Sequence, residues 1–243
     1  MNVGTEQPPV FGVSGPSGSG KTKLMEYLIE KLNEKGYKVA TIKHTRGKFS
    51  LDEEGKDTWR HRKAGSTLAV FSSPIETAYI EEKIDKLDRI IRTLPRLGSF
   101  DIILVEGFHE SEIPKIAVGK GKRTRTAKNV VLHYEDNKEE VLELLIEAIQ
   151  THHITKKLPG LNCGDCGLNS CQELAKAILN GERTLNDCKN LAASRINLWV
   201  NGEPIPLSGF PSRMIRDTVI GMLNSLKGVE HLENLVLEIK SQD

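Results

Sequence analysis

An octapeptide near the N-terminus constrains the fold more than any other feature of the sequence. Residues 15–22 are Gly-Pro-Ser-Gly-Ser-Gly-Lys-Thr, which fits the phosphate-binding pattern G-x-x-x-x-G-K-[ST]. The match follows an apolar run at Val10–Ser14 and opens a helical stripe that includes Leu24 and Leu28. Glycines here let successive backbone N–H groups turn toward phosphate oxygens, and the helix adds a favourable dipole. The sequence therefore predicts a strand, a phosphate-binding loop and a helix, in that order.

The loop combines a backbone cradle with two side chains that can reach a nucleoside triphosphate. Lys21 can contact the β- and γ-phosphates, and the hydroxyl of Thr22 can coordinate Mg²⁺. The pattern carries no information about the base. All eight residues of the loop are predicted to bind nucleotide: Gly15, Pro16, Ser17, Gly18, Ser19, Gly20, Lys21 and Thr22.

Short apolar runs alternate with helical stripes through the first 150 residues. A stripe from Ile84 to Leu94 predicts a helix that ends at Pro95, and another stripe runs from Val141 to Ile149. Strands are predicted at Val10–Ser14, Tyr37–Lys43, Leu68–Phe71, Ile102–Val105, Ile116–Val118 and Val130–Leu132. The alternation predicts an α/β protein with a P-loop NTPase-type, mostly parallel sheet and helices on both faces.

A carboxylate that assists the metal is expected at the end of a buried strand. The continuous apolar run Ile102–Val105 is typical of such a strand, and Asp101 and Glu106 flank it. Ligands of open α/β sheets bind beyond the carboxyl ends of the strands. We therefore predict that Glu106 lies near Mg²⁺ or its water ligands, and that Asp101 starts the strand.

Two polar segments are further candidates for function. The segment from His44 to Gly65 has little apolar periodicity, which predicts a long loop with at most a short helix. Long loops beside a nucleotide-binding sheet usually carry function, although a solvated surface loop is the alternative. The stretch from Lys115 to Lys128 has six basic and no acidic residues, and is either an anion-binding surface or a solvated face. Candidate site residues in and next to the first segment are Lys43, His44, Asp52, Asp57, Arg60 and His61.

All four cysteines of the chain lie close together. They follow the spacing Cys163-x2-Cys166-x4-Cys171-x16-Cys188. Clustered cysteines in a chain without a secretion signal are more typical of a metal site than of a disulfide framework. Four thiolates can hold a [4Fe-4S] cluster or a tetrahedral Zn²⁺ ion, and the spacing is not the paired C-x-x-C of most zinc ribbons.

The chain is predicted to have three parts. Residues 1–150 form the nucleotide-binding domain, residues 151–195 the four-cysteine domain and residues 196–243 a small α+β unit. Within the second part, Thr151–Lys157 is predicted to be a linker that leads to the cysteine segment.

The third part has the pattern of a ββαβ unit. Asn201-Gly202 between two apolar runs predicts a hairpin, and Pro211 suits the first turn of a helix that extends to about Leu226. Alternating apolar residues from Leu235 to Ile239 predict a final strand.

Residues 9–150 resemble the molybdopterin-guanine dinucleotide biosynthesis protein B (MobB) family. The resemblance rests on the phosphate-binding loop, on Thr41-Ile42-Lys43-His44, on the segment from Asp52 to Gly65 and on Val105-Glu106-Gly107-Phe108. It implies a homodimeric, GTP-binding accessory protein. Because the sequence offers no residue that can be assigned to positioning an attacking water, any GTP hydrolysis is expected to be slow. The implied partner is the guanylyltransferase that joins GMP to molybdopterin, with molybdopterin itself or a molybdoenzyme as further partners. No Asn-Lys-x-Asp motif for guanine is present, so GTP rather than ATP rests on the resemblance.

The cysteine segment resembles a second family over residues 158–190. This is the four-cysteine iron–sulfur domain of the electron-transport complex B subunit and of acetyl-CoA decarbonylase/synthase. The resemblance implies that Cys163, Cys166, Cys171 and Cys188 hold a [4Fe-4S] cluster, of structural or redox role.

Composition limits the remaining classes of function. A net charge of +1 and an aromatic content of 5% argue against a nucleic-acid partner, since such binding requires excess basic groups and stacking aromatics. No apolar run reaches the roughly 18 residues that span a bilayer, and Met1–Val10 lacks a signal-peptide pattern. We therefore expect a cytoplasmic protein without a membrane partner. Besides the cofactor accessory protein, the alternatives are a P-loop kinase with Asp52 or Asp57 as base, and a redox module whose nucleotide site gates docking.

Overall fold

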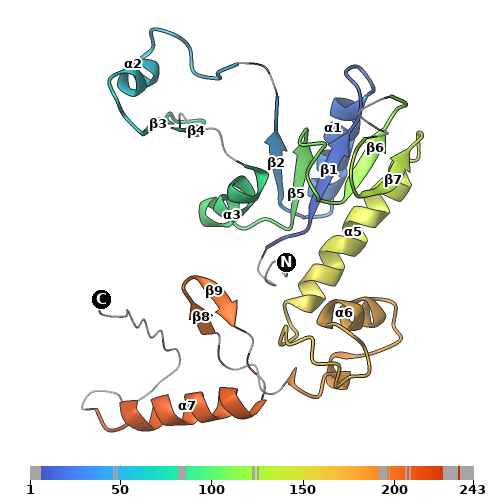
Figure 1. Ribbon diagram of the computed structural model, residues 1–243, viewed down its shortest axis with the longest axis vertical. Helices are drawn as coiled ribbons and strands as arrows, with labels where there is room; N and C mark the ends of the chain where they lie inside the picture. The colour runs from blue at the N-terminus through green and yellow to red at the C-terminus, as the bar shows by residue number, and fades with distance from the viewer. Residues whose placement is uncertain are drawn as a thin grey trace. The chain divides into compact units, whose positions relative to one another are not determined.

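The computed structural model describes residues 7–45, 47, 49–81, 86–121, 124, 126–191, 196, 198–205, 207, 209–226 and 235. Contacts divide the chain into two compact units, one spanning Gln7–Ile149 and the other made up largely of the residues from Gln150 onward. Both units are drawn in Figure 1.

The first unit is built on a five-stranded sheet. The strand order is β2 (Val39–Lys43), β5 (Ile102–Glu106), β1 (Val10–Ser14), β6 (Lys115–Val118) and β7 (Val130–Tyr134). Every pairing between neighbours in this sheet is parallel. The predicted parallel sheet is therefore confirmed, and five of the six predicted strands belong to it.

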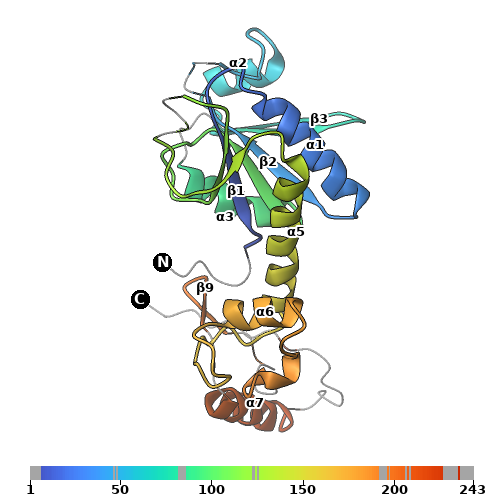
Figure 2. The same cartoon turned by 90° about the vertical axis from the view of Figure 1, so that its right-hand side faces the viewer.

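Helices cover both faces of this sheet, as predicted (Figures 1 and 2). Helices α1 (Lys21–Glu34) and α5 (Lys138–Thr155) share one core with β5 through Leu104, whereas α3 (Leu87–Leu97) packs on the opposite face with Val105. Successive side chains of a strand point to opposite faces, and β5 is buried along its whole length. Its uninterrupted apolar run is explained by this position between two layers of helices.

Two helix ends differ from the predictions. Helix α3 does not end before Pro95 but includes it and ends two residues later, at Leu97, so the lost N–H donor and the ring clash are confined to the last turn. The predicted linker Thr151–Lys157 is also wrong, because α5 continues to Thr155. The side chain of Thr151 is buried, and Ile154 packs against the apolar core of the cysteine segment, so the buried side of the helix extends beyond Ile149.

The sixth predicted strand lies outside the parallel sheet. Strand β3 (Leu68–Ser72) pairs in antiparallel fashion with β4 (Thr77–Glu81), which the sequence did not predict, and the two form a separate hairpin. The short helix α2 (Asp57–Lys63) contacts β3. Many apolar side chains of the hairpin are exposed; they are Leu68, Val70, Phe71, Ile75 and Tyr79.

An ion pair organises the segment between β2 and β3. The carboxylate of Asp52 accepts hydrogen bonds from Arg62 Nε at 2.9 Å and Nη2 at 2.7 Å, and from Thr58 Oγ1 at 2.7 Å. Only 10% of the Arg62 side chain and 4% of the Asp52 side chain are exposed. Because Thr58 and Arg62 both lie on α2, this carboxylate attaches the chain before the helix to the helix itself.

The second unit contains α6 (Cys171–Leu179), the 3₁₀ turn η1 (Leu185–Asp187), β8 (Leu198–Val200), β9 (Glu203–Ile205) and α7 (Gly209–Leu223).

The hairpin and helix predicted after residue 196 are confirmed. Strands β8 and β9 pair in antiparallel fashion across Asn201 and Gly202, whose φ values of 53° and 80° suit a type I′ turn. Pro211 lies in the first turn of α7. The predicted final strand falls outside the described residues except for Leu235. None of the described helices is both long enough and apolar enough to cross a membrane.

The Asp52–Arg62 pair predicts that Asp52→Asn loosens the segment between β2 and β3. A neutral amide replaces the charged acceptor of the Arg62 guanidinium, so amides of α2 should exchange with deuterium several-fold faster and residues 44–65 should be cleaved sooner by proteases. The hydrogen bond from Thr58, together with Arg62, lowers the pKa of Asp52. The stabilisation of the folded segment by this carboxylate is therefore present above about pH 4 and is lost as the pH falls further.

Asp57→Asn is the matched control for this test. Its carboxylate is exposed and lies 3.8 Å from Arg60 Nη1, so exchange should stay at the parent rate. Equal exchange rates in the parent and in Asp52→Asn would contradict the structural role of the pair.

Candidate functional site

The carboxyl ends of β1, β5 and β2 meet at one edge of the parallel sheet. In the strand register Glu106 is the partner of Val13 on one side and of Lys43 on the other. The predicted phosphate-binding loop leaves β1 directly after Ser14. The structure thus brings the loop, Lys43 and Glu106 to the edge where α/β sheets bind ligands.

The loop between β1 and α1 has the conformation that its glycines predict. Gly18 and Gly20 have φ values of 74° and 90°, in the left-handed region that favours glycine. Helix α1 begins at Lys21, and among the described residues no side chain caps its first turn. The first N–H groups of α1 therefore lack a side-chain acceptor, which is the arrangement that binds phosphate at a helix start. Lys21 Nζ donates a hydrogen bond to the carbonyl of Pro16, across the loop.

The base of the loop is tightly packed against β6. A Cβ atom at Gly15 would lie 2.1 Å from the carbonyl oxygen of Val118, so no other residue fits this backbone. The hydroxyls of Ser14 and Ser19 are buried and have no hydrogen-bond partner among the described residues. Buried polar atoms of this kind indicate a site that a ligand, ion or water completes, and they fit a nucleotide-binding loop.

Glu106 is held in place from its backbone and from its side chain. Its carbonyl accepts a hydrogen bond of 2.8 Å from the N–H of His44, and its carboxylate forms an ion pair with Lys43 Nζ. The Glu106 side chain is 12% exposed and that of Lys43 is 62% exposed. A carboxylate in this position can act on Mg²⁺ or its waters, with Lys43 as its neutralising partner in the absence of the ion.

The segment after Glu106 interlocks with the segment after Lys43. The rings of His44 and Phe108 are stacked with centroids 4.0 Å apart. Gly107, which precedes Phe108, has a φ of 106°, and a Cβ atom there would lie 2.8 Å from the His44 carbonyl oxygen. The pairing of Lys43-His44 with Glu106-Gly107-Phe108 is therefore a steric requirement, which sequence patterns alone did not reveal.

The remaining candidates of the long segment are not all available for chemistry. Asp52 is engaged by Arg62 and Thr58, so it suits a structural role better than that of a kinase base. Asp57, Arg60 and His61 are exposed on α2, which lies with β3 and β4 beside the sheet (Figure 1).

The described residues of the basic stretch from Lys115 to Lys128 also have structural roles. Lys115 is fully buried, and its ammonium donates to the carbonyls of Ser111, Ile113 and Lys128. Burial lowers the pKa of Lys115. Lys128 pairs with Glu112 at 2.6 Å. Three further members of the stretch, Lys122, Arg123 and Arg125, lie outside the described residues.

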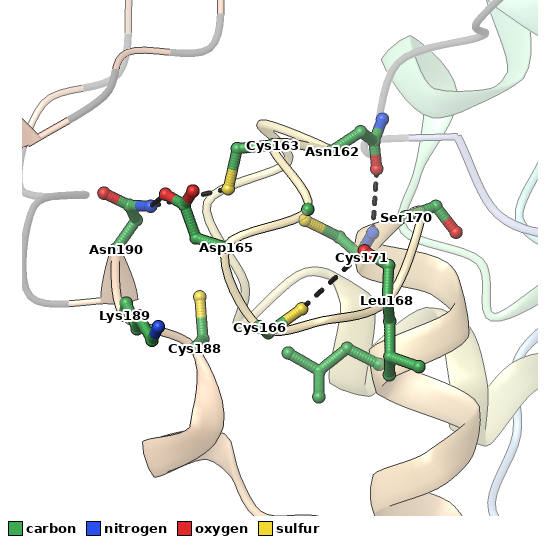
Figure 3. Close-up of a pocket in the computed structure, with 12 residues that line it drawn as sticks. Asn162, Cys163, Asp165, Cys166, Leu168, Ser170, Cys171, Cys188, Lys189 and Asn190 are labelled. Carbon is green, nitrogen blue, oxygen red and sulfur yellow. Dashed lines mark hydrogen bonds between the residues drawn. The ribbon is translucent and has the colours of Figure 1, made fainter.

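The four cysteines line one small pocket in the second unit (Figure 3). Cys163 and Cys166 lie in the loop before α6, Cys171 is the first residue of α6, and Cys188 follows η1. All four are free thiols, Cys163 being exposed and Cys171 buried. The structure therefore brings together the four residues that the spacing predicted.

Local hydrogen bonds shape the loop that carries the first cysteines. The Asn162 side chain accepts a hydrogen bond of 2.8 Å from the N–H of Cys171 and so closes the loop. Within it, Gly164 and Gly167 have φ values of 76° and 84°, and a hydrogen bond of 2.8 Å joins their backbones. Ser170 caps α6 by accepting from the N–H of Glu173.

The donor set of the pocket fits a centre that is bound by thiolates. Four cysteine thiols line it, and thiolates are the ligands that both an iron–sulfur cluster and a tetrahedral zinc ion need.

Burial raises the pKa of the Cys188 thiol, and the neighbouring cysteines raise it further, Cys171 first among them. The backbone N–H of Asn190 opposes this by hydrogen bonding to the Cys188 sulfur. A bound cationic centre would oppose this effect, because it favours the thiolate form of Cys188.

Fold and loop together define a P-loop NTPase-like α/β protein that is continued by a four-cysteine segment. Residues 10–143 match the family model described as "Molybdopterin guanine dinucleotide synthesis protein B" (MobB), and residues 158–189 match the model described as "Putative Fe-S cluster". The chain belongs to the MobB family.

Individual relatives differ in how much of the chain they match. A protein of Methanocaldococcus jannaschii named "Putative molybdopterin-guanine dinucleotide biosynthesis adapter protein" is 33% identical over 95% of this chain and 97% of its own length. The "Molybdopterin-guanine dinucleotide biosynthesis adapter protein" of Haemophilus influenzae is 38% identical over 49% of this chain and 67% of its own. The crystal structure of Bacillus subtilis MobB covers 58% of this chain and 97% of its own, with 23% identity and a TM-score of 0.48.

The steric requirement at Gly107 predicts a larger loss of stability for Gly107→Ala than for Gly36→Ala. Both glycines have positive φ, but a Cβ at Gly36 meets no atom within 4 Å. Alanine at Gly36 should therefore cost only the backbone penalty of about 1–2 kcal/mol. Alanine at Gly107 should cost about 1–3 kcal/mol more, because His44 must move. Urea unfolding of the two variants measures the difference, and equal losses would contradict the interlock.

Proposed function

We propose that this chain is a GTP-binding accessory protein for synthesis of the guanine dinucleotide form of the molybdenum or tungsten cofactor. It acts in the cytoplasm, hydrolyses GTP slowly at its phosphate-binding loop, and carries a [4Fe-4S] cluster. The observation that carries the proposal is the meeting of the loop, Lys43 and Glu106 at one edge of the parallel sheet. Family membership and the adapter names of its relatives support the same role.

The residues of the edge take distinct roles toward Mg²⁺-GTP. Backbone N–H groups of Gly15 and of residues 17–20 surround the phosphates, and Lys21 leaves the Pro16 carbonyl to reach the β- and γ-phosphates. The Thr22 hydroxyl and the Glu106 carboxylate hold Mg²⁺ directly or through water. The ion, when bound, supplies charge neutralisation at the phosphates.

Hydrolysis at this site is expected to be slow. Water attacks the γ-phosphorus and GDP leaves, but the described residues include no side chain that we can assign to orienting that water. Without such a residue, charge neutralisation alone gives a low turnover. Slow turnover suits an adapter, which uses the bound nucleotide to present or retain a partner.

The proposed partners follow from the family's name, which refers to the synthesis of molybdopterin guanine dinucleotide. The guanylyltransferase joins GMP to molybdopterin, so an accessory protein with GTP bound would act beside it, and molybdopterin or a molybdoenzyme would be a further partner.

A second copy of the chain is proposed to cover the exposed apolar side chains of the β3–β4 hairpin. Ile75 is 92% exposed there and Val70 is 50% exposed, and an isolated two-stranded hairpin gains little stability in water.

Nucleotide binding is tested by Lys21→Ala with Lys23→Ala as its control. Lys23 lies on the same helix and is exposed, so its loss leaves the loop intact. We expect Lys21→Ala to weaken GTP binding by at least about tenfold, because a charge-assisted contact to phosphate is lost. Calorimetric titration measures it, and unchanged affinity in Lys21→Ala would remove the basis of the proposal.

Metal analysis tests the cysteine site. Purified without oxygen, the full chain should contain about four iron and four sulfide per chain. Cys171→Ser should lose most of both, while Ser170→Ala, which removes only the helix cap beside it, should retain them. Zinc in the parent protein, with neither iron nor sulfide, would refute the cluster.

A further inference from the structure

One amide side chain contacts a cysteine sulfur at the edge of the cysteine pocket. Asn190 Nδ2 lies 3.4 Å from Cys163 Sγ and 2.6 Å from Asp165 Oδ2 (Figure 3). Cys163 is the exposed cysteine, so the contact is made at the solvent-facing corner of the pocket. The backbone N–H of Asn190 acts on Cys188, but its side chain and that of Asp165 are directed at this other corner.

Asp165 determines which end of the amide faces the sulfur. A carboxylate only accepts hydrogen bonds, so the Asn190 atom that lies 2.6 Å from it must be the nitrogen. That nitrogen carries two hydrogens and can donate to the carboxylate and to the sulfur at once. The geometry therefore directs a donor, rather than the amide oxygen, at Cys163.

A donor at this position affects the redox chemistry of a bound cluster. One-electron reduction of a [4Fe-4S]²⁺ cluster with four thiolates raises its net negative charge from about −2 to about −3. Hydrogen bonds to ligand sulfur stabilise the more negative state and so raise the reduction potential. The charge of Asp165 has the opposite effect, and its hydrogen bond to the amide partly offsets it.

We propose that Asn190, oriented by Asp165, is a positioning residue that raises the reduction potential of the cluster by donating a hydrogen bond to Cys163. The inference rests on the proposed iron–sulfur cluster and adds a redox function to its exposed corner. The electron comes from a low-potential one-electron donor, and no bond within the cluster breaks.

The test is a redox titration of the anaerobic full-length protein, followed by electron paramagnetic resonance. Asn190→Ala should shift the midpoint potential to a more negative value, because the donor is lost. Asn190→Ser retains one short O–H donor and should fall between Asn190→Ala and the parent, which keeps the test valid if the alanine variant binds its cluster poorly. Asn169→Ala is the control, since its amide contacts Glu173, and should keep the parent potential.

Failure of the proposed cluster and failure of the role of Asn190 give different results. Parent protein without iron and sulfide would refute the proposed cluster before any variant is compared. A parent with a full cluster, and variants of Asn190 with the parent midpoint potential, would overturn the role of Asn190 alone. A variant that binds less iron but keeps that midpoint would assign Asn190 a purely structural role, which also overturns the inference.

Discussion

The parallel pairing of β5 between β1 and β2 is the constraint on which the nucleotide site depends. Its register places Glu106 beside both Val13 and Lys43, so the carboxylate meets its lysine and the phosphate-binding loop at one edge. The same register brings the chain after β5 against His44, where Gly107 avoids a steric clash. A shift of one residue would separate these groups and turn every side chain of β5 to the wrong face.

The cysteine site depends on local turns instead of a sheet. Two left-handed glycines and the Asn162 side chain bring a loop of nine residues, from Cys163 to Cys171, around one pocket. Cys188 completes it from beyond α6, and Asn190 follows two residues later. In the proposed function the nucleotide unit binds GTP beside the guanylyltransferase, and the cluster adds a redox-sensitive centre to the same chain.

Sequence patterns predicted those features whose cause is local. The phosphate-binding loop, the β8–β9 turn at Asn201 and the four cysteines each depend on neighbouring residues, and the structure places them as expected. The prediction at Pro95 was wrong because α3 accommodates the proline in its last turn, and the linker predicted at Thr151–Lys157 was wrong because the buried side of α5 continues beyond Ile149. The Asp52–Arg62 pair and the Asn190–Cys163 contact join residues 10 and 27 positions apart, which no periodicity reveals. Asn162 and Asn190 could have been suspected only from their places beside the cysteines.

The Mg²⁺ dependence of GTP binding tests the central claim, that the edge around Glu106 is a nucleotide–metal site. Titration calorimetry of the full chain should show tighter GTP binding with Mg²⁺ than without it, and weaker binding of ATP. Glu106→Gln keeps the shape of the side chain and should lose most of the Mg²⁺ enhancement while retaining metal-free binding. GTP affinity that is independent of Mg²⁺, or the same Mg²⁺ enhancement in Glu106→Gln as in the parent, would contradict the account.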